Sequence, residues 1–480
     1  MITIPLNAHS RTPMYIQIYE YIKKEILDSR LQAGEKLPSA RSLAANLQVS
    51  RSTVDTAYEQ LVAEGYVEAR SKRGFFINPI THLQQFTTTK HRDEQTPRQD
   101  VKKVSIRYDF NPDAIDTGHF PYSVWKSLGK NQLDIPDNFL LGDRRGEEPL
   151  RQAIASYLLG SRGVRCTPEQ IILGAGLSHL LQMLGVLFER RAVIAMEDPG
   201  YRTARQVLFS SGYTILDIPL KDHSLDVQKL AASPADLCFV TPSHQFPLGS
   251  VMSISRRQAL LAWAAGQESR YIIEDDHDSE FRYKGKPIPA LQSLDSAAKV
   301  IYIGTFSKAI SPAVRVGYMV LPPHLMERYR QICGSYSCPV PRMEQAILTD
   351  FIKQGYFEKH LNRMRKIYKG KHDRILQCVQ TYFPPDLVEV SGDYAGLYIL
   401  LRYLGPLAED VIESEARKNG MELRSLKGYY SHLPADYVPT YLLGFANLSE
   451  EKIEPGIACL ATKVFHVPGP YPVVSGPEAR

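Results

Sequence analysis

The sequence contains no long apolar run. No stretch approaches the ~20 consecutive apolar residues that a membrane helix requires, and the N-terminus lacks the apolar core of a signal peptide. Cysteine is also scarce, because the 6 cysteines are scattered over 480 residues without the spacing of a metal site or a disulfide framework. We therefore expect a cytoplasmic protein that has reduced thiols, binds no metal and does not contact a membrane.

Neither sign of charge dominates. The chain has 57 Lys and Arg against 52 Asp and Glu, and its hydrophobic content of 44% is that of a globular protein. A length of 480 residues exceeds the size at which one hydrophobic core stops growing, so at least two folding units are expected. Most of the positive excess lies before residue 106, where 15 basic residues stand against 11 acidic ones. A basic balance suits a polyanionic partner, although so small an excess also suits a solvated surface.

The first eighty residues carry a succession of helix signals. Between Pro13 and Leu27, apolar residues recur at spacings of three and four, which predicts an amphipathic helix. In the segment "GEKLPSARSLAANLQVSRSTVDTAYEQLVAEGYVEARSKRGFFI", Ser39 and Ser50 each precede a helical pattern as N-caps. Gly65 ends the second pattern, and two short strand patterns follow with basic residues between them. The order of helix, turn, helix and basic hairpin predicts a winged helix-turn-helix.

The second helix of this motif opens with small and basic residues, where a recognition helix presents its first turn to the major groove. A helical interaction domain with solvated charges is the alternative. The segment "LPSARSLAANLQVSRSTVDTAYEQLVAEGYV" resembles the GntR family of bacterial regulators, and the resemblance extends from about Pro13 to Asn78. The pattern of the two helices and the hairpin tip, together with this resemblance, implies DNA contacts at Arg41, Ser50, Arg51, Ser52, Thr53, Lys72, Arg73 and Gly74.

Residues 81–105 are polar, mixed in charge and poor in periodic apolar residues, which predicts a flexible connector. We therefore expect a DNA-binding domain at 1–80, a linker at 81–105 and a second domain at 106–480.

In the second domain, short apolar runs alternate with longer helical patterns. The expected strands are Gln170–Leu173, Ala192–Met196, Leu237–Val240, Tyr271–Glu274, Val300–Ile303 and Tyr318–Leu321. Each run is apolar on both faces, as a parallel strand covered by helices on two sides should be. The pattern predicts an α/β fold with a mostly parallel sheet.

Ligands gather at the carboxyl ends of parallel strands, and four of these ends are followed by groups with a chemical use. Glycines and a serine in "GAGLSHLLQML" open a helix, which favours an anion such as phosphate. Tyr201 follows another strand and supplies an aromatic ring. Asp275 and Asp276 supply carboxylates, and Lys308 supplies an amine. Pyridoxal phosphate requires this combination: a phosphate cradle, a stacking surface, an acid for its ring nitrogen and an amine for a Schiff base.

From about Arg107 to the C-terminus, the chain is similar to fold-type I aminotransferases. The segments "TPSHQFPLG", "EDPGY", "IIEDDHDSEFRY" and "GTFSKAISPAVRVGYMV" resemble the MocR/GabR regulators, which fuse a GntR-type head to such a domain. The resemblance implies a pyridoxal 5'-phosphate cofactor held by Lys308 as a Schiff base, with Asp275 at the ring nitrogen and Tyr201 stacked on the ring. The residues implied for the phosphate are Gly176, Leu177, Ser178, Thr305, Ser307 and Arg315.

The chain departs from this family pattern at three places. His277 stands where a tyrosine usually binds the phenolic oxygen of the cofactor, and Leu141 replaces an aromatic residue that often reaches the neighbouring subunit's phosphate. The third departure is the lack of any arginine between Arg424 and Arg480, where relatives clamp a substrate carboxylate. We therefore expect an effector other than a simple amino acid held by that segment: pyridoxal phosphate itself, a dipeptide-like amine, or an acid. The candidate arginines for an acid are Arg202, Arg205 and Arg424.

These expectations together predict a transcriptional regulator that binds a double-stranded DNA operator as a homodimer and senses an amine-bearing effector through aldimine chemistry. The alternative is a working aminotransferase with an appended DNA-binding domain, because the lysine, acid and phosphate-binding groups that transamination requires all occur in the sequence. A third interpretation is a GntR-type regulator whose large domain binds an unrelated ligand. Sustained turnover of amino and keto acids would favour the enzyme, and a stalled half-reaction would favour the sensor.

Overall fold

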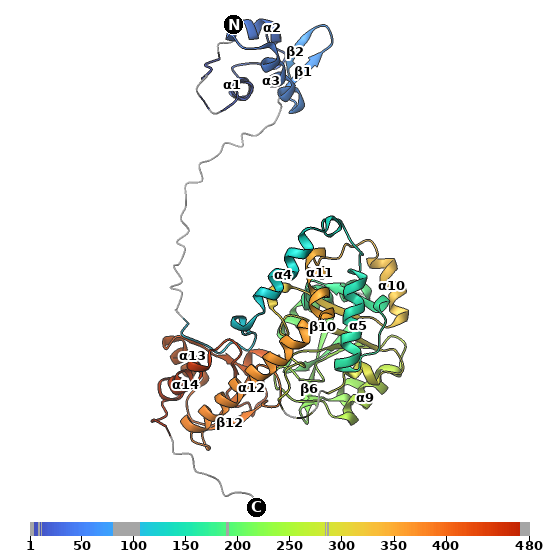
Figure 1. Ribbon diagram of the computed structural model, residues 1–480, viewed down its shortest axis with the longest axis vertical. Coiled ribbons are helices and arrows are strands. Elements are labelled where there is room, and N and C mark those ends of the chain that lie inside the picture. Colours follow the sequence, from blue (N-terminus) through green and yellow to red (C-terminus); the bar gives the residue numbers. More distant parts are fainter. Residues whose placement is uncertain are drawn as a thin grey trace, which may run out of the picture. The chain divides into compact units, whose positions relative to one another are not determined.

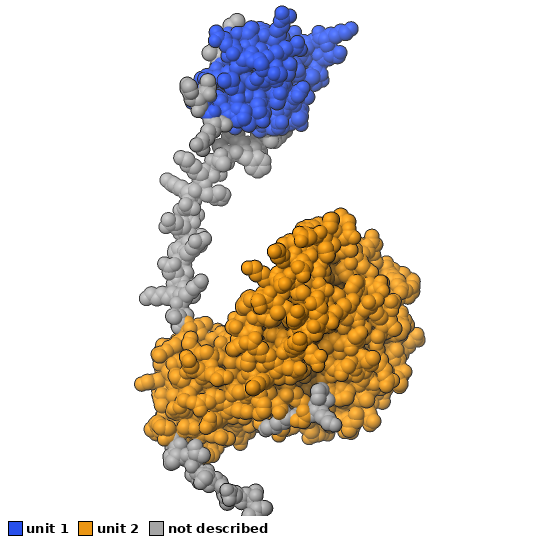
Figure 2. All heavy atoms as spheres, in the orientation of Figure 1, with its two compact units in different colours: residues 1–103 blue, residues 104–480 orange. Residues whose placement is uncertain are grey.

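The computed structural model describes residues 4–7, 10, 12–79, 106–188, 192–283, 285 and 288–470. The chain forms two compact units, Met1–Lys103 and Val104–Arg480, which are blue and orange in Figure 2. The linker expected at 81–105 lies outside the described residues. None of the helices in the described part of the chain combines the length and the apolar content that crossing a bilayer requires.

The described residues of the first unit form three helices and a hairpin (Figure 1). Its elements are α1 (Met14–Leu27), α2 (Ala40–Leu47), α3 (Arg51–Ala63), β1 (Val67–Arg70) and β2 (Gly74–Ile77). Both predicted caps are present, because the hydroxyls of Ser39 and Ser50 accept hydrogen bonds from backbone amides three residues on. The core includes the fully buried Ile18, Ile22, Val54, Ala57, Tyr58 and Leu61. The winged helix-turn-helix predicted from the sequence is confirmed.

The second unit is built on an eight-stranded sheet. In spatial order its strands are β4 (Ile171–Gly174), β11 (Gly317–Val320), β10 (Val300–Thr305), β9 (Tyr271–Asp275), β8 (Leu237–Val240), β5 (Val193–Asp198), β6 (Thr214–Lys221) and β7 (Ser224–Leu225). The pairs β10–β9, β9–β8, β8–β5 and β5–β6 are parallel, which confirms the predicted α/β class.

One strand differs from its predicted direction. The run at Tyr318–Leu321 was expected to be parallel, but β11 is antiparallel to both β10 and β4. Residues 306–316 are the whole connection between β10 and β11, and a parallel pair requires a longer crossover, usually one that contains a helix. The sequence also gave no sign of β6 and β7, because β6 is partly exposed and lacks the doubly apolar pattern.

Both faces of the sheet are covered, as doubly apolar strands require. Adjacent residues of one strand point to opposite faces, and Ile272 and Ile273 accordingly belong to two separate hydrophobic clusters. The helices of the Ile273 cluster are α6 (Leu177–Leu187), α7 (Arg202–Ser210) and α10 (Pro323–Cys333). Those of the Ile272 cluster are α8 (Val227–Ala231) and α9 (Ile254–Ala265).

A second, antiparallel sheet follows in the C-terminal part of the unit. Its strands, in spatial order, are β12 (Val388–Ser391), β13 (Tyr398–Tyr403), β16 (Thr440–Gly444) and β15 (Arg424–Ser425). The remaining helices are α4 (Tyr122–Leu133), α5 (Glu148–Arg162), α11 (Arg342–Lys353), α12 (Tyr356–Tyr382), α13 (Glu409–Lys418) and α14 (Glu450–Cys459).

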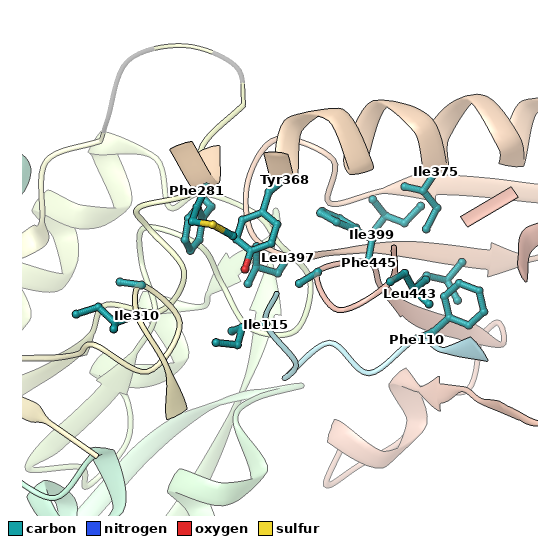
Figure 3. Close-up of a cluster of buried hydrophobic side chains, with 14 of the residues drawn as sticks. Phe110, Ile115, Phe281, Ile310, Tyr368, Ile375, Leu397, Ile399, Leu443 and Phe445 are labelled. Carbon is teal, nitrogen blue, oxygen red and sulfur yellow. The ribbon is translucent and has the colours of Figure 1, made fainter. Parts of the chain in front are cut away.

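The first residues of the second unit pack against its last third. Strand β3 (Tyr108–Asp109) pairs in parallel with β14 (Met421–Glu422). Phe110 follows β3 and lies beside Leu443 in a cluster that extends to Phe281 and Tyr368 (Figure 3). This cluster places Phe110 in the core of the second unit.

Candidate cofactor and effector site

Strand register brings the predicted cofactor residues to one end of the large sheet. Thr305 at the end of β10 is paired with Gly317, and Gly317 is paired with Gly174 at the end of β4. On the other side of β10, Ile303 is paired with Asp275 at the end of β9. Residues from three separate parts of the sequence therefore lie side by side where parallel sheets bind ligands.

The start of α6 and Arg315, which the sequence predicts to bind phosphate, lie next to each other. Leu177 and Ser178 are the first two residues of α6, so their backbone N–H groups have no acceptor within the helix. Gly176 precedes them with φ 82°, and a Cβ placed there would meet Arg315 Nη2 at 2.9 Å. Arg315 Nη2 donates to the Ala175 carbonyl at 2.7 Å, which places the guanidinium beside the helix N-terminus. This combination of amides and a guanidinium favours a dianion.

Lys308 lies in the turn that follows β10, after Thr305 and Ser307. Its side chain is 14% exposed, and Nζ donates to the Pro112 carbonyl at 2.9 Å. The amide of Ser307 donates to the Thr305 hydroxyl at 3.4 Å, which shapes the turn. The lysine amine therefore lies near the surface of the site, in contact with the segment that follows β3.

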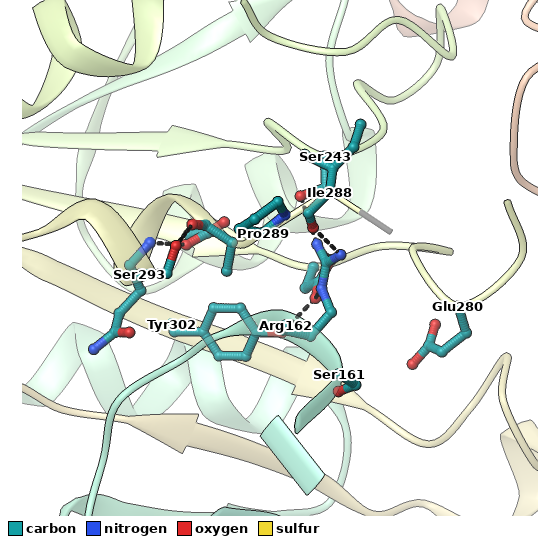
Figure 4. Close-up of polar contacts among 12 residues, drawn as sticks. Ser161, Arg162, Ser243, Glu280, Ile288, Pro289, Ser293 and Tyr302 are labelled. Carbon is teal, nitrogen blue, oxygen red and sulfur yellow. Dashed lines mark hydrogen bonds and ion pairs between the residues drawn. The ribbon is translucent and has the colours of Figure 1, made fainter. Parts of the chain in front are cut away.

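The two carboxylates after β9 have different surroundings. Asp276 accepts hydrogen bonds from Arg162 Nε at 2.7 Å and Nη2 at 3.1 Å, and also from the Tyr302 hydroxyl. Figure 4 shows Arg162 between Tyr302 on one side and Ser243 and Ile288 on the other. The guanidinium of Arg162 also donates hydrogen bonds to Ser243 and Ile288, so the Asp276 that it contacts belongs to a buried structural network. Asp275 is buried outside that network, and burial raises its pKa to about 7, although His277 opposes the shift. A cationic ring nitrogen is the kind of partner that would keep this carboxyl group ionised.

An aromatic wall lies beside these groups. The ring centroids of Tyr201 and Phe246 are 5.2 Å apart, and those of Phe246 and His277 are 5.1 Å apart. The rings of Tyr201 and His277 are 6.2 Å apart with an interplanar angle of 35°. The predicted stacking residue and the histidine that replaces the family tyrosine thus line the same part of the site.

Sequence reasoning missed two buried groups behind this wall. Asp278 Oδ2 lies 3.3 Å from His277 Nε2, yet neither carboxylate oxygen of Asp278 has a hydrogen-bond partner among the described residues. Burial alone lowers the pKa of His277, but the negative charge of Asp278 outweighs it and the net shift is upward. His244 is buried and burial lowers its pKa to about 4. The segment "TPSHQFPLG" directly follows β8, so the end of that strand was the signal for His244.

A cavity of about 640 Å³ adjoins the aromatic wall. Its lining includes Asp113, Tyr201, Arg202, Arg417, Arg424 and Lys427. Arg202 and Arg424 are therefore brought together as candidate effector ligands, whereas Arg205 forms an ion pair with Asp217 and is not part of the lining. Arg417 and Lys427 were missed, because charges on α13 and in a short turn look like ordinary solvated residues.

The stretch between Arg424 and Arg480, which lacks the family arginine, has Leu442 and Asn447 instead, and both make contacts of their own. Leu442 is fully buried in β16, where it is paired with Arg424 of β15. Asn447 Nδ2 donates to Asp109 Oδ2 at 2.8 Å. Neither side chain carries a positive charge that could bind a carboxylate.

The predicted DNA contacts all lie on the surface of the first unit. Arg51 opens α3 with 71% of its side chain exposed and lies 3.3 Å from Asp55. The Ser50 hydroxyl lies 2.8 Å from those of Ser52 and Thr53. Arg41 is exposed in the first turn of α2. The exposed Lys72 and Arg73, followed by Gly74 with φ 106°, form the hairpin tip.

The fold and the site define a protein with a winged helix-turn-helix joined to a domain of the aminotransferase type. The family model for bacterial regulatory proteins of the gntR family matches residues 14–77, and the model for aminotransferase class I and II matches residues 111–409. The fold of the second unit resembles that of a kynurenine aminotransferase from Pyrococcus horikoshii. That likeness has a TM-score of 0.67 and 24% identity, and it covers 76% of this chain and 92% of the other.

Relatives over the full length carry the same combination. The chain is 41% identical over 458 residues to an uncharacterized HTH-type transcriptional regulator, YdeL, of Bacillus subtilis, which covers 95% of this chain and 98% of that protein. It is 32% identical over 471 residues to the probable rhizopine catabolism regulatory protein MocR of Rhizobium meliloti. This match covers 95% of this chain and 94% of that protein. The chain belongs to the MocR-type transcriptional regulators, in which a GntR-family helix-turn-helix precedes an aminotransferase class I domain.

Proposed function

We propose that this regulator binds pyridoxal 5'-phosphate at the carboxyl ends of its parallel strands and uses it to sense an amine-bearing metabolite. The observation that supports this most is the convergence of an amine, a buried carboxylate, an aromatic wall and an anion cradle at one end of one sheet. The bound cofactor would supply an electrophilic carbon that reacts with primary amines.

Each residue of the site would have a separate task. Lys308 would hold the cofactor covalently, and Arg315 with the amides of Leu177 and Ser178 would bind its phosphate. Asp275 would pair with the ring nitrogen, and Tyr201 would pack on the ring. His277 would donate a hydrogen bond to the phenolic oxygen, because its contact with Asp278 favours the protonated imidazole.

We propose a homodimer as the DNA-binding form. Three consecutive apolar side chains lie in water in the isolated chain: Phe139 is 64% exposed, Leu140 63% and Leu141 88%. A second copy of the chain is the proposed cover, because two winged helices then read two half-sites of an operator. Sedimentation equilibrium tests this proposal: wild type should be a dimer and Leu141→Asp should dissociate more readily, whereas a monomeric wild type would refute it.

The central test uses the purified full chain supplied with pyridoxal phosphate. We expect an absorbance band at a longer wavelength than any band of the cofactor-free protein. Borohydride should fix the cofactor on the peptide that contains Lys308. Lys308→Ala should give neither result. Colourless wild-type protein without an adduct would overturn the proposal.

A second measurement addresses sensing. The cofactor-loaded chain should bind a duplex that it has enriched from a random double-stranded library. At least one member of a panel of amines and small peptides should change the affinity, and the same compound should leave Lys308→Ala unaffected. If the compound changed the DNA affinity of wild type and of Lys308→Ala equally, the response would not depend on the cofactor.

Aminotransferase activity is the second candidate. Lys308, Asp275 and the phosphate cradle are the groups that transamination requires, and the fold is shared with aminotransferases. Sustained conversion of an amino acid and a keto acid would favour an enzyme. Reaction that stops after one equivalent would favour a sensor.

A further inference from the structure

The segment that enters the second unit from the linker passes directly through the cofactor site. This entry segment, residues 108–116, begins with β3 and continues past Lys308, whose Nζ donates to the Pro112 carbonyl at 2.9 Å. It is fixed at both ends. Asp109 accepts from Asn447 at 2.8 Å, and Asp116 accepts from Lys371 at 2.7 Å.

Within the entry segment, Asp113 lies between two cations. Its Oδ2 is 2.8 Å from Arg424 Nη1, and its Oδ1 is 3.9 Å from Lys308 Nζ. The side chain of Asp113 is 44% exposed, and both Asp113 and Arg424 line the 640 Å³ cavity. An internal carboxylate therefore lies where an amine-bearing acid that reacted beside Lys308 would place its own carboxylate.

The charges of the cavity favour an incoming acid. Four cationic side chains, those of Arg202, Arg417, Arg424 and Lys427, line it together with the carboxylates of Asp113 and Glu413. Glu413 already lies 3.0 Å from Arg417. Arg424 has two carboxylate neighbours, Glu422 at 3.8 Å and Asp113 at 2.8 Å, and Asp113 is the nearer one and the one that lines the cavity. Arg424 can exchange Asp113 for a ligand carboxylate without losing a charge-assisted hydrogen bond.

We propose that Asp113 is a built-in competitor for the acid group of the effector. A ligand with both an amine and a carboxylate displaces Asp113 from Arg424, whereas a simple amine leaves that contact in place. This inference rests on the proposed cofactor-dependent sensing and names its ligand class, an amine-bearing acid. A ligand shifts a conformational equilibrium only through differential binding, so the carboxylate is what releases Asp113.

The release is confined to a short part of the chain. Phe110 and Ile115 are buried in the core, and Asp109 and Asp116 keep their hydrogen bonds, so the residues set free are 111–114. These residues follow the linker in chain order.

The test uses the cofactor-loaded full chain and matched probes. The acids are 3-aminopropanoate, 4-aminobutanoate and 5-aminopentanoate, and the amines are propylamine, butylamine and pentylamine. The change in cofactor absorbance gives the affinity of each probe. The quantity compared is the ratio of acid to amine affinity at equal chain length, because it cancels effects on the amine reaction.

Wild type should prefer the acid at one or more lengths. Asp113→Asn should raise the ratio by about fivefold or more, because the competitor has lost its charge. Arg424→Gln should abolish the preference, and adding Asp113→Asn to Arg424→Gln should change nothing further. Arg402→Gln is the control, because Arg402 lies in the same antiparallel sheet but forms an exposed ion pair with Glu389 outside the cavity.

Hydrogen exchange gives a second readout. The acid of highest affinity should speed exchange of the amides in 111–114, and the matched amine should not. Equal affinities for acid and amine at every length, or a ratio that Asp113→Asn leaves unchanged, would overturn the inference while the cofactor still binds. A chain that binds neither cofactor nor any amine would instead refute the proposed function itself.

Discussion

Asp275 combines a proposed role in cofactor binding with a cost to the stability of the cofactor-free protein. Burial raises the pKa of its carboxyl group from 3.8 to about 7. An acid whose pKa is higher in the folded state makes folding less favourable as the pH rises through that interval. We therefore expect Asp275→Asn to raise the melting temperature of cofactor-free protein above pH 7 and to weaken retention of pyridoxal phosphate.

Thermal unfolding of the cofactor-free protein and dialysis of the loaded protein measure the two effects. Asp222→Asn is the matched control, because Asp222 is 78% exposed in its ion pair with Arg256 and should change neither quantity appreciably. A lower melting temperature together with undiminished cofactor retention would contradict the assignment.

The pair of His277 and Asp278 should make the fold less stable both at high pH, where His277 loses its proton, and at low pH, where Asp278 gains one. The raised pKa of His277 stabilises the fold below pH 6.5, and this contribution is lost as the pH rises through the raised value. The lowered pKa of Asp278 stabilises the fold above pH 3.8, and this contribution is lost as the pH falls through the lowered value. We expect Asp278→Asn to reduce the melting temperature most between pH 3.8 and 6.5.

Asn is the suitable replacement, because Asp278 has φ 55°, a left-handed conformation that Asn tolerates. Removing one partner of a buried ion pair costs about 3–5 kcal/mol, and the amide that remains reduces this cost. Asp373→Asn is the control, because Asp373 also lies beside a neighbouring histidine, His372, but is 55% exposed and pairs with Lys369 as well. Equal losses at all pH values would show that the pair is not charged.

At the scale of elements, the N-terminus of α6 depends on a residue without a side chain at position 176. Gly176 has φ 82°, and its missing Cβ leaves room for Arg315 Nη2. Gly176→Ala should cost about 1–3 kcal/mol through backbone strain and should move the guanidinium away from the cradle. We expect lower stability in chemical denaturation and weaker binding of pyridoxal phosphate.

Gly160→Ala is the matched control. Gly160 lies in α5 with open space around the position of a Cβ, so alanine should stabilise that helix by about 0.5–1 kcal/mol and leave cofactor binding unchanged. Unchanged cofactor affinity in Gly176→Ala would argue against phosphate binding at this helix.

The sequence predicted elements whose signals are local. N-cap serines and apolar runs predicted α2, α3 and the central strands to within a few residues. The groups predicted after β4, β5, β9 and β10 lie together in the candidate site, and their roles stay predictions. The direction of β11 was wrong, because it depends on the length of a connection rather than on the strand's own residues. Asp113 was missed because its importance lies in its distance to Arg424, which is 311 positions away in the chain.

At the scale of the whole molecule, the chain divides into two compact units with separate cores. The proposed DNA contacts lie in the first and the proposed cofactor site in the second. Substitutions in distant sites with no shared contacts affect stability and binding independently. Each function should therefore be removable without the other.

Arg51→Gln and Lys308→Ala provide this separation. Arg51 is exposed at the start of α3, and loss of a base or phosphate contact there should weaken binding to the enriched duplex by about 1–3 kcal/mol. Fluorescence anisotropy should show this loss with cofactor retention and the amine-induced absorbance change intact. Lys308→Ala should do the reverse: it should keep basal DNA affinity and lose the response to amines. If Arg51→Gln also released the cofactor, or Lys308→Ala abolished basal DNA binding, the two units would have to fold or assemble as one.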